Sequence, residues 1–207
     1  IGFTPYAVLS FLARAVGRSS VAELLPLLST LVLSYILCAV QSFGVDGLLV
    51  KFVAKLSPIK FFKGIAPAQY VAFTTQSSVG TIPVTLRQLK EALGVDADVA
   101  SFTAGLGANV GMPACAGIWP ALTAVFSVHM LGYHYGIAQY AFLILITLVV
   151  SVGTVGVPGT ATITSTAVFA ALGLPIELVV VFAPISTIVD MARTMTNVTG
   201  AATAAVI

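Results

Sequence analysis

The feature that most constrains this chain is a series of apolar segments, several of which are interrupted by glycine, proline and hydroxyl residues. The stretch "SVGTVGVPGT" at residues 151–160 separates the apolar runs "YAFLILITLVV" and "ATITSTAVFAALGLP". Glycine and proline free backbone groups, and the bilayer core offers them no water. Irregular backbone at membrane depth is tolerated only where it is buried in protein or lines a polar cavity. The interrupted segments therefore predict a polar cavity inside a membrane protein.

The residue composition agrees with this prediction. Of the 207 residues, 58% are hydrophobic and only 8% are charged, whereas soluble domains carry about 25% charged residues. We expect an all-α, multi-pass protein of the cell (inner) membrane, in contact with the lipid bilayer and without enzyme activity. No basic cluster points to nucleic acid as a partner. The first apolar stretch is shorter than the roughly 20 residues of a spanning helix, so we expect the chain to begin inside a helix of a longer protein.

The positions of the cationic residues indicate which segments begin and end on the same side of the membrane. They gather on both flanks of residues 64–86, at Lys51, Lys55, Lys60, Lys63, Arg87 and Lys90. Cationic loops remain cytoplasmic, so residues 64–86 are predicted to return to the side on which they begin; a spanning segment is the alternative. The predicted segments are 1–17 (the end of a helix), 20–44 (a span), 45–63 (amphipathic), 64–86 (broken), 99–132 (broken), 138–176 (broken) and 177–207 (a final span).

A short repeat links the broken segments. The tetrapeptide "SVGT" occurs at 78–81 and again at 151–154, and a proline follows each copy. Interrupted hydrophobic segments at matching places in two halves are typical of a transporter site built on an inverted repeat. Helix N-termini at such breaks suit a carboxylate. The nearby hydroxyls belong to Ser77, Ser78, Thr81 and Thr154. A kinked helix pair packed through glycine is the alternative.

The final span carries charged residues near its middle, in "DMARTMTNVTG" at 190–200. Asp190, Arg193 and Asn197 are spaced i, i+3, i+7 and share one helical face, flanked by Thr194. An ionised group at the bilayer centre costs at least about 2.5 kcal/mol on insertion scales, so this face is predicted to line a cavity. The aspartate would bind an ammonium, the arginine a carboxylate and the asparagine a second carboxylate. This combination suits an amino acid; a purely structural Asp190–Arg193 pair is the alternative.

At this point the sequence resembles the C-terminal half of the dicarboxylate/amino acid:cation symporters, the family of bacterial aspartate and glutamate transporters. "FTTQSSVGTIPVTL" is similar to its first re-entrant hairpin, and "GANVGMPACAGIWPAL" occupies the place of the unwound motif of its seventh helix. "SVGTVGVPGTATITSTAVFAALGLP" is similar to the second hairpin, and "DMARTMTNVTG" matches the substrate motif of the eighth helix almost letter for letter. The resemblance covers essentially the whole chain.

The resemblance implies a glutamate-transporter-like elevator fold and an obligate homotrimer. Residues 1–44 would hold the ends of helices five and six, and residues 45–207 would form most of the mobile transport domain. Within that domain the resemblance implies hairpin 1 at about 60–92, a broken helix seven at about 98–132, hairpin 2 at about 138–176 and helix eight at about 177–207. The implied substrate-binding residues are Ser77, Ser78, Val155, Gly156, Gly159, Asp190, Arg193, Thr194 and Asn197.

The sequence departs from the family where sodium is bound. Sodium-coupled members carry Asn-Met-Asp-Gly-Thr in helix seven, and residues 111–115 here read "GMPAC". A further sodium-liganding aspartate is replaced by Ala201, and an acidic residue one turn before Asp190 is replaced by Ser186. Hard cations prefer oxygen ligands, usually including carboxylates. The coupled cation is thus Na⁺ or H⁺. If a sodium site persists, its expected ligands are backbone oxygens near Gly107, Asn109, Gly111 and Asn197.

"CAGIWPA" and the opening "TPYAVLSFLA" resemble the bacterial cystine-uptake branch of the family more closely. We therefore expect a secondary active symporter that imports L-cystine, with acidic amino acids or another dicarboxylate as close alternatives. Gly111 and Ala114 would leave room for a larger substrate. The residues alone leave two other classes of membrane protein open. Broken helices also build ion channels, and a structural membrane subunit is the third possibility.

Overall fold

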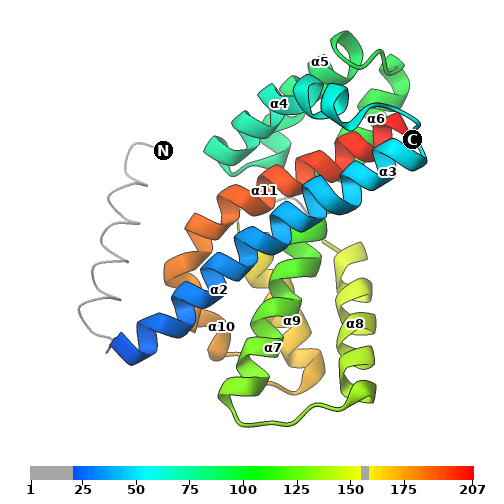
Figure 1. The fold of residues 1–207 in the computed structure, drawn as a ribbon. Coiled ribbons are helices and arrows are strands. Elements are labelled where there is room, and N and C mark those ends of the chain that lie inside the picture. Colours follow the sequence, from blue (N-terminus) through cyan, green and yellow to red (C-terminus); the bar gives the residue numbers. More distant parts are fainter. Residues whose placement is uncertain (1–20, 155–158) are drawn as a thin grey trace.

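The computed structural model describes residues 21–154 and 159–207, and within them every regular element is a helix (Figure 1). The prediction of an all-helical protein is confirmed. The elements are α2 (Val21–Ala39), the π-helical turn η1 (Val40–Asp46), α3 (Gly47–Phe52), α4 (Pro58–Thr75), α5 (Ser78–Glu91), α6 (Ala97–Gly107), the π-helical turn η2 (Pro113–Ile118), α7 (Trp119–Met130), α8 (Ile137–Val152), α9 (Thr160–Leu172), α10 (Leu178–Val181) and α11 (Ala183–Val206).

Two long helices cross the middle of the molecule side by side. One is the continuous helix formed by α2, η1 and α3, and the other is α11 (Figure 1). The span expected to end at residue 44 instead continues to Phe52, so that boundary is wrong. Gly44 lies inside the π-helical turn η1, and the helix continues through it. The chain turns only after residue 52, where Lys55 adopts a left-handed conformation (φ 55°) and Pro58 starts the next helix.

The shorter helices approach these two from opposite ends. Helices α4, α5 and α6 lie at one end, and α7, α8 and α9 lie at the other (Figure 1). α4 and α5 pack against each other and are joined by a tight turn. Gln76 takes the left-handed conformation that ends α4 (φ 55°), and the Ser77 side chain caps α5 by accepting a hydrogen bond from the Gly80 N–H. A Ser N-cap satisfies one of the orphan donors of a helix N-terminus.

Two further helices are interrupted. The chain leaves helical geometry at 108–112, between α6 and η2, and Pro113 occupies the start of η2, where its missing N–H costs nothing. The final span, predicted as one helix over 177–207, is also broken. It divides into α10 and α11 at Phe182, because Pro184 lies in the first turn of α11 and cannot donate to the preceding turn.

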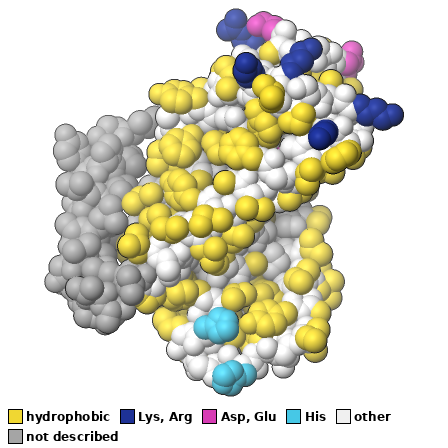
Figure 2. Space-filling model, viewed as in Figure 1, with side chains coloured by type: hydrophobic (Ala, Val, Ile, Leu, Met, Phe, Trp, Pro, Cys, Tyr) yellow, Lys and Arg dark blue, Asp and Glu magenta, His cyan; other side chains and the backbone are white. Residues whose placement is uncertain are grey.

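Helices of membrane length are present in the described part. Pro26–Phe52 and Pro113–Met130 are long and apolar enough to cross a membrane, and Ile137–Val152 and Thr160–Leu172 are shorter apolar helices. Within Pro26–Phe52, only 22% of an 18-residue apolar stretch is buried inside the protein. This helix is therefore not the core of a soluble domain. Its apolar side chains instead cover a broad face of the molecule (Figure 2). Such an apolar surface suits a lipid or protein environment.

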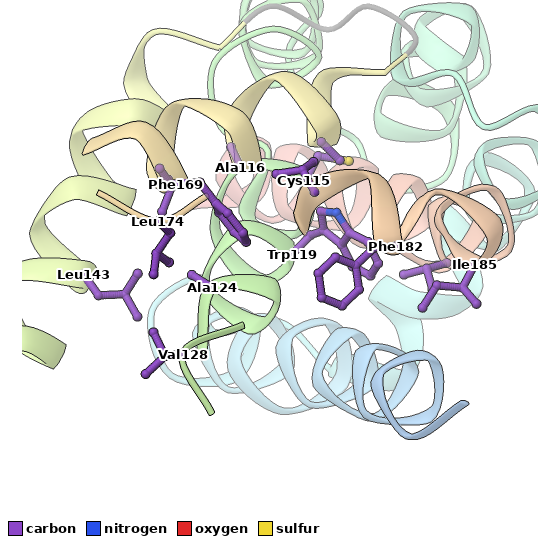
Figure 3. Close-up of a cluster of buried hydrophobic side chains, with 14 of the residues drawn as sticks. Cys115, Ala116, Trp119, Ala124, Val128, Leu143, Phe169, Leu174, Phe182 and Ile185 are labelled. Atoms are coloured by element: carbon purple, nitrogen blue, oxygen red, sulfur yellow. The ribbon is translucent and has the colours of Figure 1, made fainter. Parts of the chain in front are cut away.

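The largest buried core lies between α7, α9 and α11. Trp119 packs edge-on against Phe182, with ring centroids 6.0 Å apart, and Ile185 lies beside them (Figure 3). Phe169 joins this cluster from α9. The cluster thereby fixes the start of α7 against the first turns of α11, where the charged residues of the final helix begin.

Candidate functional site

A cavity of about 360 Å³ lies where the predicted binding elements meet. Its walls come from the α4–α5 turn, the start of α9, the break before η2 and the first half of α11. α5 and α9 both begin at this cavity, so the partial positive charge of their N-termini is directed into it. The volume falls within the range of about 300–1,000 Å³ that is usual for small-molecule sites.

Arg193 is the most deeply buried charge on this cavity, with 2% of its side chain exposed. Its guanidinium lies over the Trp119 ring, 4.4 Å from the centroid. Nη2 donates to the Ser186 carbonyl at 2.9 Å and to the Ser186 hydroxyl at 3.2 Å, and it lies 3.1 Å from Asp190 Oδ1. Nε and Nη1 have no hydrogen-bond partner among the described residues. The arginine is therefore held in place while donors that a carboxylate could satisfy stay unused.

Asp190 forms the acidic side of the cavity and is more open than its partner, with 24% of its side chain exposed. The Cys115 thiol donates a long contact to its Oδ1, at 3.8 Å. Both residues line the cavity. The predicted pairing of opposite charges on one face of the last helix is present. Asp190 is partly open to the cavity, whereas Arg193 lines it but is almost completely buried.

Asn197 faces away from the cavity, although it shares the helical face predicted for it. Its Oδ1 accepts from the N–H of Ala114 at 2.9 Å and of Cys115 at 3.5 Å, and its Nδ2 donates to Cys115 Sγ at 3.0 Å. It is 1% exposed and is not part of the cavity wall. The structure thus places this side chain as a cap on η2, where it fixes the start of that turn against α11.

The other predicted substrate residues are gathered at the same place where they are described. Ser77, Ser78, Gly159 and Thr194 all line the cavity. Gly159 begins α9 with a φ of 85°, a left-handed conformation that strains any residue with a Cβ. Val155 and Gly156 lie outside the described residues.

Among the positions considered for a sodium ion, Gly107 borders a small space of about 10 Å³ that Thr85 and Ala201 also line and that no carboxylate lines. Gly107 lies against Ala201 so closely that a Cβ on Gly107 would be 2.5 Å from the Ala201 Cβ. The Asn109 side chain donates to the Gly105 carbonyl at 3.0 Å, and Gly111 lies in the break between α6 and η2. In residues 21–154 and 159–207, no group of at least three His, Cys, Asp or Glu side chains could hold a metal ion.

Sequence reasoning missed two features of the site. Ser186 appeared only as the replacement for an acidic residue, yet it is the main hydrogen-bond partner of Arg193. Its spacing of seven residues before Arg193 places it on the same helical face, which is the signal that could have identified it. The stacking of Arg193 on Trp119 has no local signal, because the two residues come from different helices.

Comparison with known proteins gives consistent results. The model of the family described as "Sodium:dicarboxylate symporter family" matches residues 1–207. An uncharacterized symporter from Haemophilus influenzae is 36% identical over 208 residues, which cover 100% of this chain and 47% of that protein. The L-cystine uptake protein TcyP is similar in Bacillus anthracis (34% identity over 205 residues) and in Bacillus licheniformis (30% over 205), in each case over 99% of this chain and 44% of the relative. The chain thus spans less than half the length of these relatives.

Proposed function

Because the chain belongs to the sodium:dicarboxylate symporter family, we propose that it supplies the substrate site of a secondary active symporter that imports an amino acid. L-cystine is the favoured substrate, and acidic amino acids or dicarboxylates are the alternatives. The relatives named for L-cystine uptake support this choice. The chain spans less than half the length of these relatives, so uptake is proposed for a full-length protein of their size.

The observation that carries the proposal is the charge arrangement of the cavity. Asp190 offers a carboxylate to an ammonium group, and Arg193 offers two guanidinium nitrogens that lack partners among the described residues. The N-termini of α5 and α9 add partial positive charge. A zwitterion carries both of the charges that this wall can bind, whereas a sugar carries neither. The Asp190–Arg193 contact at 3.1 Å would then be the resting arrangement, which the substrate rearranges.

A disulfide-linked amino acid fits this site in two respects. L-cystine has two zwitterionic ends, so one end can occupy the Asp190–Arg193 pair while the other extends along the wall. Gly111 has no side chain at the position where sodium-coupled members of the family carry asparagine, which would leave room for a larger substrate. An acidic amino acid would use the same aspartate and arginine but would fill less of the cavity of about 360 Å³.

We also propose an elevator mechanism, in which residues 45–207 form the mobile transport domain of each subunit of a homotrimer. Helix pairs α4–α5 and α8–α9 would be the hairpins and would gate the cavity from opposite sides of the membrane, and the interruption at 108–112 would be the unwound part of helix seven. Two features support this: the pairs enter from opposite ends of the molecule, and the starts of α5 and α9 both line the cavity. The proposed boundary near residue 44 would fall inside the continuous helix from Val21 to Phe52.

The test is uptake of labelled L-cystine by the full-length protein in proteoliposomes, competed with excess unlabelled L-aspartate under an imposed sodium or proton gradient. Concentrative uptake of L-cystine that resists aspartate supports the proposed substrate. Cystine uptake that aspartate abolishes would support the acidic alternative. If neither amino acid is accumulated under either gradient, the proposed function is wrong.

A further inference from the structure

A second buried carboxyl group, Asp46, lies outside the cavity and has no role in the substrate site. It ends the π-helical turn η1 and is 3% exposed. Its Oδ1 accepts one long hydrogen bond from Gln41 Nε2, at 3.4 Å, and its Oδ2 is buried without a partner in the part of the chain that is described. Buried polar groups are normally satisfied, so a half-satisfied carboxyl requires an explanation.

No cation neutralises this carboxyl within the described residues. The elements that pack on η1 are α2, α3 and α11, and α4 packs on α3. Their titratable and charged side chains are Tyr35, Cys38, Lys51, Lys60, Lys63, Tyr70, Asp190 and Arg193, and Glu23 lies at the far end of α2. None of the described cationic side chains forms an ion pair with Asp46. The surroundings are apolar: the next residue, Gly47, lies against the Phe62 ring, which also packs on Phe43.

These observations decide which form of the carboxyl the site favours. An ionised carboxylate without a counter-ion is strongly disfavoured at such a position. A neutral carboxylic acid, with its proton on Oδ2, removes the charge and needs only modest hydrogen bonding. The turn that holds Asp46 is π-helical, a geometry that occurs often at functional sites. The arrangement thus favours the neutral, protonated form of this carboxyl group.

The same turn is linked to the helix that carries the substrate residues. Ser42 Oγ donates to Thr196 Oγ1 at 3.0 Å, and Thr196 in turn donates to the Cys38 carbonyl at 3.4 Å. Thr196 precedes Asn197, which caps η2 and contacts Cys115 at the cavity wall. A change of charge at Asp46 therefore acts on a turn that is bonded to α11 and, through it, is next to the substrate site.

We propose that Asp46 is the site of the coupled proton: its carboxylate takes up one proton to become a neutral carboxylic acid, crosses the membrane with the loaded transport domain and releases that proton on the other side. This inference rests on the proposed symport. The replacement of a liganding aspartate of the sodium-coupled members by Ala201 removes one sodium ligand, which favours a proton as the coupled ion.

The test uses the full-length protein in proteoliposomes that contain a pH-sensitive dye. An inward gradient of L-cystine, or of L-aspartate if that is the substrate, should acidify the lumen in the wild type. Asp46→Asn should lose substrate-driven acidification and concentrative uptake, and should retain exchange of internal for external substrate. Asp98→Asn is the matched control, because it removes an exposed carboxylate at the start of α6, and it should behave as the wild type.

Other outcomes would overturn the inference. Unchanged acidification by Asp46→Asn excludes Asp46 as the proton site, as does wild-type uptake driven by sodium without acidification, although the proposed symport would survive both results. Absence of any amino acid uptake in the wild type would overturn both. If Asp46→Asn does not fold, dicyclohexylcarbodiimide can be used on the wild type, since it modifies buried protonated carboxyls. Loss of proton flux should then track modification of Asp46 in peptide mapping, and flux lost with Asp46 unmodified would contradict the inference.

Discussion

At the scale of the residue, the site depends on how two buried polar side chains are held. Arg193 is fixed by Ser186, Asp190 and the Trp119 ring, all without using Nε or Nη1. Asn197 uses both polar atoms of its side chain on η2: Oδ1 accepts from the Ala114 N–H, and Nδ2 donates to Cys115 Sγ. Arg193 thus keeps two buried donors unpaired among the described residues, and Asn197 fixes the part of η2 that borders the cavity.

Asn197→Ala is expected to destabilise the protein. It leaves the buried N–H of Ala114 without an acceptor, and an unsatisfied buried donor costs about 1–3 kcal/mol. Thermal melting of the purified full-length protein in detergent measures the effect. Ser101→Ala, an exposed site on α6, should change the free energy of unfolding by no more than about 0.5 kcal/mol. Equal melting temperatures for the two variants would show that the cap on η2 contributes nothing.

The sequence predicted the charged face of the last helix because helical periodicity is a local property. Asp190 and Arg193 were placed together by their spacing alone, and they are in contact. The role of Asn197 was not predictable in this way. Its partner Ala114 lies 83 positions away, and only the packing of η2 on α11 decides whether the amide faces the cavity or the backbone.

At the scale of the element, the fold is shaped by where helices are interrupted and how closely they approach. Prolines mark the starts of α4, η2 and α11. The starts of α4 and η2 were close to positions expected from sequence, whereas the break before α11 was not expected, because one helix was predicted over 177–207. The π-helical turn η1 carries no comparable signal, since no proline occurs at 40–46. The predicted end of that span at residue 44 was therefore wrong.

Gly107→Ala tests the close approach of α6 and α11. The added Cβ would lie 2.5 Å from the Ala201 Cβ and 3.2 Å from its Cα, so the helices must separate. Overpacking of this kind costs about 1–3 kcal/mol, which a lower melting temperature of the full-length protein would report.

The controls for this prediction come from the same helices. Gly105→Ala meets no atom within 4 Å, and its better helix propensity should leave stability unchanged or raise it by up to about 1 kcal/mol. Combining Gly107→Ala with Ala201→Gly should recover part of the loss. A double variant as unstable as Gly107→Ala alone would mean that Ala201 is not the residue that clashes.

At the scale of the whole molecule, the cationic side chains and the histidines lie at opposite ends. Lysine and arginine gather at the end formed by α4 and α5, and the two histidines lie at the opposite end (Figure 2). The sequence predicted the first group, because both flanks of residues 64–86 are cationic. Only the family resemblance led us to expect that the turn between α4 and α5 shares a cavity with the start of α9, since this depends on contacts between distant segments that local patterns do not report.

The charge distribution predicts the membrane orientation. Cationic ends remain cytoplasmic, so Lys60→Cys and Lys90→Cys, both exposed, should react with a membrane-impermeant maleimide only from the cytoplasmic side. His134→Cys should react from the other side. Intact cells and inside-out vesicles distinguish the two, using full-length protein whose other cysteines have been replaced. Labelling of Lys60→Cys and Lys90→Cys from opposite sides would mean that the α4–α5 pair spans the membrane.

The most direct test of the central claim is equilibrium binding of labelled L-cystine and L-aspartate to the purified full-length protein, wild type and Arg193→Ala. The cavity is proposed to hold the substrate carboxylate on this arginine. Losing a hydrogen bond to a charged group, worth about 1.5–3 kcal/mol, should weaken binding about 10- to 150-fold. Arg87→Ala removes an exposed arginine paired with Glu91 at 2.9 Å and should bind as the wild type. If a folded Arg193→Ala protein binds both amino acids with wild-type affinity, the cavity beside Asp190 and Arg193 is not the substrate site.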